Sequence, residues 1–136
     1  MSVDATLEDS NSGFFKIVLT GAAAATSGGL GAVLNPEGVD LLITRTFLYA
    51  RTGSTGAANI DIGVGSTTTT KGTDILSTFD GIEATIGGKA FYCQAVSVNE
   101  TEEAVIWEDD EYVCFTGSAT TVGLDADLYI EYIRLA

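Results

Sequence analysis

Short runs of apolar and β-branched residues, separated by turn-forming residues, recur along this chain and predict β-strands rather than helices. The clearest run is 58–64, in which apolar residues at the even positions alternate with Asn59, Asp61 and Gly63. Strict alternation of this kind is typical of a strand with one buried face. Further strands are expected at 14–20, 32–34, 39–51, 82–86, 89–98, 104–107, 111–117 and 127–135.

The long run 39–51 carries apolar residues on both faces. In a regular strand Leu41, Ile43, Phe47 and Tyr49 would share one face, interrupted by Arg45. This pattern predicts a strand with one buried face and a partly covered second face.

Turn signals join these strands. The segment 35–38 contains Pro36 and Gly38, which preset φ at a central position and tolerate positive φ at the end. The glycine-containing segment 53–56 predicts a hairpin between the long strand and 58–64. The segment 74–79 is expected to be one helical turn or an irregular crossing that places its apolar residues in the core.

The number and spacing of the strands predict the fold class. About eight short antiparallel strands with frequent turn signals favour an all-β fold, a jelly-roll-like β-sandwich. Residues 1–12 are polar and acidic and are expected to form a flexible N-terminal arm. Residues 13–136 are expected to form a single domain.

The charge balance limits the classes of partner. The 136 residues include 19 acidic and 6 basic side chains, a formal net charge of −13. Nucleic acid is not an expected partner, because binding phosphates needs a basic face. An anionic membrane surface is excluded by the same sign of charge. Adaptation to high salt is a second interpretation of this acidic, lysine-poor composition.

Targeting signals are not apparent in the sequence. The first residues lack the basic and apolar regions of a secretory signal. No apolar run approaches the roughly 20 residues that span a bilayer. We therefore expect synthesis in a cytoplasm without export and no membrane association.

Cys93 and Cys114 are too few for a disulfide scaffold and too far apart for a zinc knuckle. We expect two buried thiols in neighbouring strands, with a disulfide as the alternative.

Catalytic groups are scarce. The chain has no histidine, which excludes Ser-His-Asp and Cys-His arrangements and removes the usual general base at neutral pH. The sequence therefore predicts a protein that is not an enzyme, with no catalytic or cofactor-binding residues.

An acidic cluster is the one candidate for metal binding. Glu108, Asp109 and Asp110 are candidate ligands of Ca²⁺, which prefers carboxylate oxygens. The same residues are also typical of a solvated hairpin tip, and the spacing of an EF-hand is absent. Paired carboxylates acting on a sugar are a further alternative.

Arginine and aromatic residues are candidates for contacts with other protein subunits. Arginines are expected to pair with carboxylates within the domain or across such a contact, because the planar guanidinium suits interfaces. The candidate contact residues are Phe14, Phe15, Arg45, Arg51, Trp107 and Arg134. An alternative is a sugar-binding platform built from Trp107, Tyr92, Tyr112, Tyr129 and Tyr132, although aromatic residues at strand spacing are typical of core packing.

The order of motifs from residue 39 to 136 carries a resemblance to a known family. The motifs are Leu42-Ile43-Thr44-Arg45, Thr55-Gly56-Ala57, the strand 59–65 with the Thr/Ser-rich loop after it, Leu76, Asp80-Gly81-Ile82 and the segment 126–133. In this order they resemble the small jelly-roll capsid decoration, or cement, proteins of tailed viruses. The family carries no catalytic residues.

The resemblance implies a non-enzymatic structural protein of the virion. Such a protein binds the outside of the icosahedral shell, bridges neighbouring subunits of the major capsid protein and stabilises the shell. A homotrimer is the oligomeric state that the resemblance favours, and the host cytoplasm is the implied place of synthesis. A carbohydrate-binding jelly-roll module and another virion part, such as a spike, turret or tail component, are the alternatives.

Overall fold

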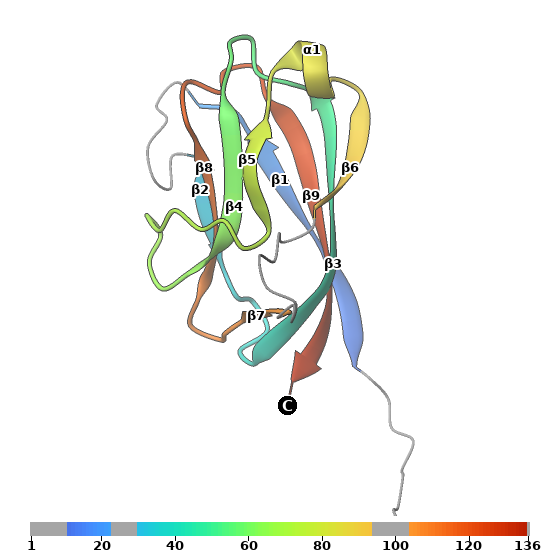
Figure 1. Ribbon diagram of the computed structural model, residues 1–136. Coiled ribbons are helices and arrows are strands. Elements are labelled where there is room, and N and C mark those ends of the chain that lie inside the picture. The colour runs from blue at the N-terminus through green and yellow to red at the C-terminus, as the bar shows by residue number, and fades with distance from the viewer. Residues whose placement is uncertain (1–10, 23–29, 94–103, 136) are drawn as a thin grey trace, which may run out of the picture.

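The computed structural model describes residues 11–22, 30–93 and 104–135 (Figure 1). Within them the chain forms nine β-strands and one short helix. The elements are β1 (Ser12–Thr20), β2 (Gly31–Leu34), β3 (Asp40–Thr52), β4 (Asn59–Gly65), β5 (Leu76–Asp80), α1 (Glu83–Ile86), β6 (Lys89–Cys93), β7 (Val105–Trp107), β8 (Tyr112–Gly117) and β9 (Asp125–Leu135). No helix in these residues is long and apolar enough to cross a membrane.

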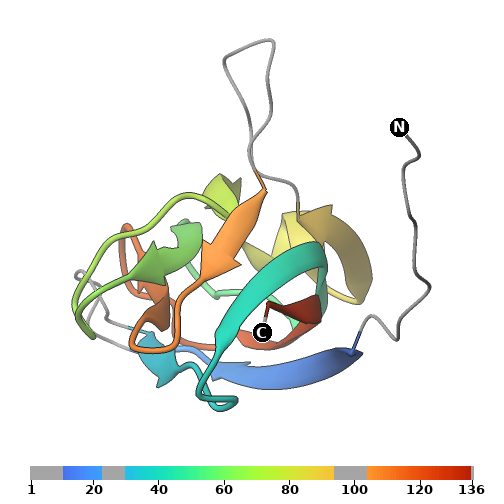
Figure 2. The same ribbon diagram turned by 90° about the horizontal axis from the view of Figure 1, so that it is seen from below.

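The strands form two antiparallel sheets that pack face to face as two layers (Figure 2). The larger sheet has the order β1-β9-β3-β6, with β7 paired to the beginning of β3, and the smaller sheet has the order β2-β8-β4-β5. The pairs β1/β9, β2/β8, β3/β6 and β4/β5 are nested in the sequence, so the chain runs as one long hairpin folded over on itself. This arrangement confirms the predicted all-β sandwich of antiparallel strands.

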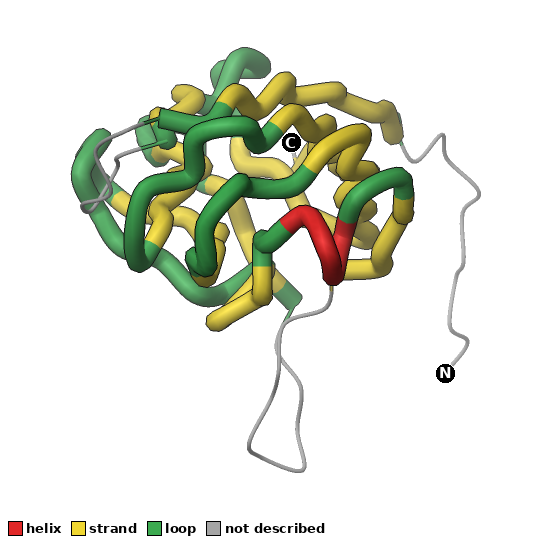
Figure 3. Tube along the Cα trace, turned by 90° about the horizontal axis from the view of Figure 1, so that it is seen from above, coloured by secondary structure: helices red, strands yellow, loops and turns green. Residues whose placement is uncertain are grey.

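The core lies between the two sheets and is built from alternate residues of the strands. Its largest fully buried side chains include Trp107, Phe115, Leu48 and Leu128. Each such side chain contributes roughly 1.5–3 kcal/mol through its removal from water. Figure 3 shows that loops and α1 lie at one end of the sandwich.

The long strand β3 changes its core-facing set of residues partway along. The register between β3 and β9 shifts just after Ile43. An extra residue at such a bulge reverses the alternation of side chains. Ile43 therefore faces the core before the shift and Leu48 faces it afterwards. The prediction that Phe47 and Tyr49 share a face with Leu41 was wrong, because it assumed a regular strand.

The predicted hairpin between β3 and β4 is also wrong. β3 pairs with β9, β6 and β7, whereas β4 pairs with β8 and β5. The chain crosses from one sheet to the other at 53–58, where the Ser54 hydroxyl donates to the carbonyls of Gly56 and Gly81 at 2.6 and 3.0 Å. This segment is held by contacts with a distant part of the chain rather than by a cross-strand turn.

Two local assignments differ from the sequence interpretation. The segment that was expected to be a helical turn or an irregular crossing forms the strand β5, in which Leu76 is buried. The next segment, expected as a short strand, contains α1 instead. The strand expected at 89–98 is described only as far as Cys93, and residues 1–10 of the expected arm lie outside the described residues.

The two cysteines are free and buried, as expected, and form no disulfide. They do not lie in neighbouring strands, because Cys93 belongs to the larger sheet and Cys114 to the smaller one. Burial raises the pKa of the Cys93 thiol to about 11 and raises the pKa of Cys114 as well. Neither thiol is therefore ionised at neutral pH.

The outer face of the smaller sheet is partly covered by the chain itself. Asp61 on β4 is buried, accepts the backbone N–H of Thr78 at 2.7 Å and lies 3.5 Å from the ammonium of Lys71. A side chain at Gly63 would collide with the backbone of Gly72, so the connection between β4 and β5 lies directly on the strand. The larger sheet carries the more exposed outer face.

Candidate functional site

Alternate residues of β1, β9, β3 and β6 point away from the core and form a continuous surface on the larger sheet, seen edge-on in Figure 2. We call the part of this surface that begins at the row Phe14–Glu131–Arg45 and runs to Arg51 the aromatic face. Its charged and large apolar members are Phe14, Lys16 and Val18 on β1, Asp125, Asp127, Tyr129 and Glu131 on β9, Arg45, Phe47, Tyr49 and Arg51 on β3, and Tyr92 on β6. The register aligns Lys16, Tyr129, Phe47 and Tyr92 in one row across the four strands. Such cross-strand neighbours lie close enough to interact.

Several large apolar side chains of the aromatic face are open to solvent. Phe14 is 58% exposed, Val18 59% and Tyr92 78%. The rings of Phe47 and Tyr92 lie 5.0 Å apart and are inclined at 52°. Exposed apolar residues that gather on one surface are typical of an interaction site, whereas isolated ones are not.

Arg45 forms a two-pronged ion pair across β3 and β9. Its Nε donates to Oε1 of Glu131 at 3.1 Å and its Nη2 to Oε2 at 2.9 Å. The guanidinium also lies 5.7 Å from the centre of the Phe47 ring. The hydrogen bonds from Arg45, and one from Thr44, hold the pKa of Glu131 below its usual value. The two opposite charges of this ion pair therefore cancel each other at a fixed position on the aromatic face.

Arg51 holds two carboxylates at once. Its guanidinium donates to Asp125 at 3.0 and 2.6 Å and to Asp127 at 2.5 and 3.2 Å. Asp127 is buried, so its charge depends on this partner. Hydrogen bonds from Arg51 hold the pKa values of both aspartates below the usual range, and the charge of Lys16 lowers that of Asp127 further.

These ion pairs predict a specific dependence of stability on pH. Because the folded pKa values of Asp125, Asp127 and Glu131 are lowered, their stabilising effect is complete above the unfolded values near 4. The effect is lost as the pH falls through the lower folded values. We expect the urea concentration at the unfolding midpoint to fall as the pH is lowered from about 5 to about 2. The Arg51→Gln variant should show a smaller fall over the same range.

The control for this prediction is Lys89→Gln, which removes an equal charge from a side chain whose ammonium donates to the carbonyl of Thr85. It should keep the pH dependence of the wild-type chain. Identical pH profiles for Arg51→Gln and the wild type would contradict the role given to Arg51.

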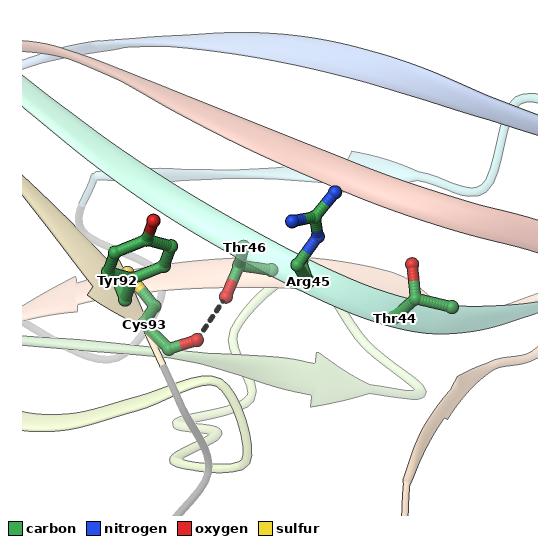
Figure 4. A pocket seen from close by; sticks show the side chains of 5 residues that line it. All are labelled: Thr44, Arg45, Thr46, Tyr92 and Cys93. Carbon is green, nitrogen blue, oxygen red and sulfur yellow. Dashed lines mark hydrogen bonds between the residues drawn. The ribbon is translucent and has the colours of Figure 1, made fainter.

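A shallow hollow of about 230 Å³ lies beside the aromatic face, lined by Thr44, Arg45, Thr46, Tyr92 and Cys93 (Figure 4). The Thr46 hydroxyl donates to the carbonyl of Cys93 at 2.6 Å. These five side chains include no carboxylate, and the Cys93 thiol, with a pKa of about 11, stays protonated. The hollow therefore offers shape and hydrogen bonds rather than acid–base chemistry.

The acidic candidates for calcium lie in the turn between β7 and β8. The backbone N–H of Asp109 donates to Asp40 at 3.0 Å, and that of Glu108 to Glu111 at 3.2 Å. Repulsion from Glu111, then burial and other carboxylates, raises the pKa of Glu108. Asp110 adds to this repulsion. Within the described residues, no group of three or more metal-binding side chains is arranged to hold an ion.

Two solved capsid structures contain this fold. A chain of the capsid of Ralstonia phage GP4 is 17% identical, with a TM-score of 0.55, over 99% of this chain and 90% of that one. A chain of the acid-stable capsid of Helicobacter pylori bacteriophage KHP30 is 12% identical, with a TM-score of 0.53, over 90% of this chain and 86% of that one. No protein-family model and no curated protein matches the sequence.

Of the six candidate contact residues, three come together on the aromatic face. Phe14, Arg45 and Arg51 lie there on two strands of the larger sheet. Phe14 lies more than 30 positions before the two arginines in the sequence. The three residues share one face because β1 and β3 both pair with β9. The expected pairing of arginines with carboxylates within the domain is present at both arginines.

The other three candidates lie elsewhere. Trp107 is fully buried, and Phe15 packs against it and stacks on Tyr132 at 4.4 Å, so Trp107 offers no surface to a partner. Arg134 pairs with Glu37 and links β9 to the turn between β2 and β3. This ion pair of Arg134 therefore joins two parts of the same domain.

Sequence reasoning missed several members of the aromatic face. Phe47 and Tyr49 were placed on the same face as Leu41 and Ile43, because the bulge in β3 leaves no clear local signal. Val18 and Lys16 were overlooked although they alternate with Ile17 and Leu19. The signal that could have identified them is the alternation along β1, in which every second residue points away from the core.

Proposed function

We propose that this chain is a non-enzymatic structural protein of a virus particle. In this proposal it is a decoration protein that binds the outside of the major capsid shell, acts as a homotrimer and stabilises the shell. The proposal assigns no catalytic residue and no cofactor to the chain. It places the protein on the outer capsid surface.

The observation that carries the proposal is the likeness to chains from two phage capsids. The likeness extends over most of each chain in both comparisons, so the neighbours are single domains of similar size rather than large proteins with this fold as one part. A small rigid sandwich that forms a whole chain of a capsid fits an accessory position on a shell. The exposed apolar residues of the aromatic face and the net charge of −13 support a protein that contacts other proteins rather than nucleic acid.

The physical effect of such a protein follows from linkage. A ligand that binds the assembled shell but not its separated subunits stabilises the shell by mass action. A rigid domain that contacts two neighbouring shell subunits adds contacts that must break before these separate. The proposed protein therefore needs a stable fold and binding surfaces, and no reactive group.

The sugar-binding alternative was a platform of Trp107, Tyr92, Tyr112, Tyr129 and Tyr132. Trp107 and Tyr132 are buried and cannot belong to it, so the alternative would depend on the exposed rings of the aromatic face. A sugar ring stacks on a flat aromatic surface, and coplanar rings would favour that function. The rings of Phe47 and Tyr92 are inclined at 52°, which does not make such a platform. The decoration role is therefore the better supported of the two.

The test uses virus particles whose genome encodes this chain, with the gene deleted. Purified chain is added back to these particles, which are then pelleted by centrifugation and heated in the presence of a DNA-binding dye. We expect the chain to pellet with the particles and to raise the temperature at which the dye reaches the DNA. A chain that stays in the supernatant and leaves this temperature unchanged would overturn the proposal.

A further inference from the structure

The aromatic face is electrically neutral in a strongly acidic chain. Its basic side chains are Lys16, Arg45 and Arg51, and its acidic side chains are Asp125, Asp127 and Glu131. These charges cancel, whereas the whole chain carries −13. The entire net negative charge therefore lies outside the aromatic face.

Each carboxylate of the face is already paired within the chain. Glu131 is held by Arg45, and Asp125 and Asp127 are held by Arg51. Burying an unpaired carboxylate in a protein contact is costly, because the lost hydration is not replaced. The aromatic face can be covered by another protein without leaving an unpaired carboxylate behind.

The charge pattern distinguishes between kinds of partner. Two copies of a chain with a charge of −13 repel each other, and repulsion is strongest where acidic surfaces meet. Contact between copies is least opposed where the charges cancel. A basic partner would instead gain most from the acidic surface outside the aromatic face. A neutral, partly apolar surface on this chain therefore fits a second copy of the same chain.

The size of the face is that of a small contact between copies. On β9 the face runs from Asp125 to Glu131, which is seven residues. At about 3.4 Å per residue and about 4.8 Å between strands, four strands of this length cover roughly 450 Å². Each partner in a standard protein–protein interface buries about 800 Å², so the face supplies just over half of such a contact. Phe14, Val18 and Tyr92, which are more than half exposed, are suited to be the anchoring side chains of such a contact.

We infer that the aromatic face is the self-association surface of this chain, packed against other copies of the same chain. The inference rests on the proposed function and deepens it, because it assigns a surface to the proposed homotrimer, in which each contact joins two different parts of the face. It leaves the acidic remainder of the surface for the shell. It is tested on the purified chain alone, so failure to bind capsids would leave its outcome unaffected.

The experiment measures the mass of the purified full chain by light scattering over a range of concentrations, at low and at multimolar salt. We expect an oligomer whose dissociation constant decreases as salt rises, because salt screens the repulsion between acidic copies. Two substitutions test the face: Val18→Glu, which adds a charge to the neutral surface, and Tyr92→Ser, which removes the most exposed ring. Each is expected to raise the dissociation constant at least about tenfold.

The matched control is Val122→Glu. Val122 is 45% exposed, comparable to Val18, but lies in the segment between β8 and β9 and outside the aromatic face. It makes the same chemical change at a different place and should keep the oligomer. Circular dichroism checks that every variant is folded, and Tyr92→Ser decides the result if the edge strand does not tolerate Val18→Glu.

Three results would overturn the inference. The first is a wild-type monomer at both salt concentrations. The second is an oligomer that Tyr92→Ser leaves intact, and the third is an oligomer that Val122→Glu weakens as much as Val18→Glu does. A monomer whose tyrosine fluorescence changes on titration with oligosaccharides would favour sugar binding by the same surface instead.

Discussion

Replacing Trp107 with alanine is expected to lower the free energy of unfolding by about 3–5 kcal/mol, the range for removal of a fully buried large aromatic side chain. Trp107 is fully buried on β7, where the ring of Phe15 meets it edge-on at 6.2 Å. Its indole N–H donates to the carbonyl of Glu111 at 2.9 Å. The substitution removes packing from the core and also one of two donors to this carbonyl, which accepts the backbone N–H of Asn35 at 3.0 Å as well.

Urea unfolding, followed by circular dichroism, measures the effect. The matched control is Ile106→Ala on the same short strand, where the side chain is 46% exposed. It should cost less than about 1 kcal/mol, since an exposed apolar side chain gains little from folding. A Trp107→Ala variant as stable as the Ile106→Ala variant would show that β7 is not packed on the core as described.

The positions of most strands could be predicted from the sequence, because alternation and turn residues are local signals. β4, β9 and the turn at 35–38 are clear examples. Assignment of strands to sheets could not be predicted in the same way. The segment 53–56 has the composition of a hairpin turn, yet its flanking strands belong to different sheets. Which sheet a strand joins depends on partners far away in the sequence, and the pairing of β1 with β9, the first and last strands, is the extreme case.

The candidate site could be predicted only in part, because side chains along a strand alternate between its two faces. Phe14 and Phe15 are adjacent in the sequence and were both named as contact residues, but neighbouring residues of a strand point to opposite faces. Only Phe14 lies on the aromatic face, whereas Phe15 packs toward Trp107. One bulge moved Phe47 to that face as well. A shift of a single residue therefore decides whether an aromatic side chain is core or surface.

The arginines were the more reliable guide to the face. Arg45 and Arg51 were expected to pair with carboxylates, and charge complementarity does not depend on knowing the register in advance. Which carboxylates they pair with became clear only from the pairing of β3 with β9. The neutrality of the aromatic face follows from this pairing and could not be seen in the composition.

Replacing Asn35 with alanine is expected to lower the free energy of unfolding by about 2–3 kcal/mol, because it removes the donor of one buried hydrogen bond and of two partly buried ones. Asn35 precedes the turn between β2 and β3 and is buried. Its side-chain amide donates to the carbonyls of Val39, Trp107 and Glu108 at 2.9, 3.0 and 3.1 Å. One side chain thus ties the start of β3 to the end of β7.

Asn35→Asp separates the role of the donor from that of size. The aspartate keeps an oxygen that can accept the backbone N–H of Glu37, as Oδ1 of Asn35 does at 2.9 Å. It loses the amide donor and places a carboxylate against the carbonyls of Val39, Trp107 and Glu108. We therefore expect Asn35→Asp to unfold at a lower urea concentration than Asn35→Ala at pH 7. If Asn35→Asp matched the wild type, packing alone would hold this turn, and the amide would have no structural role.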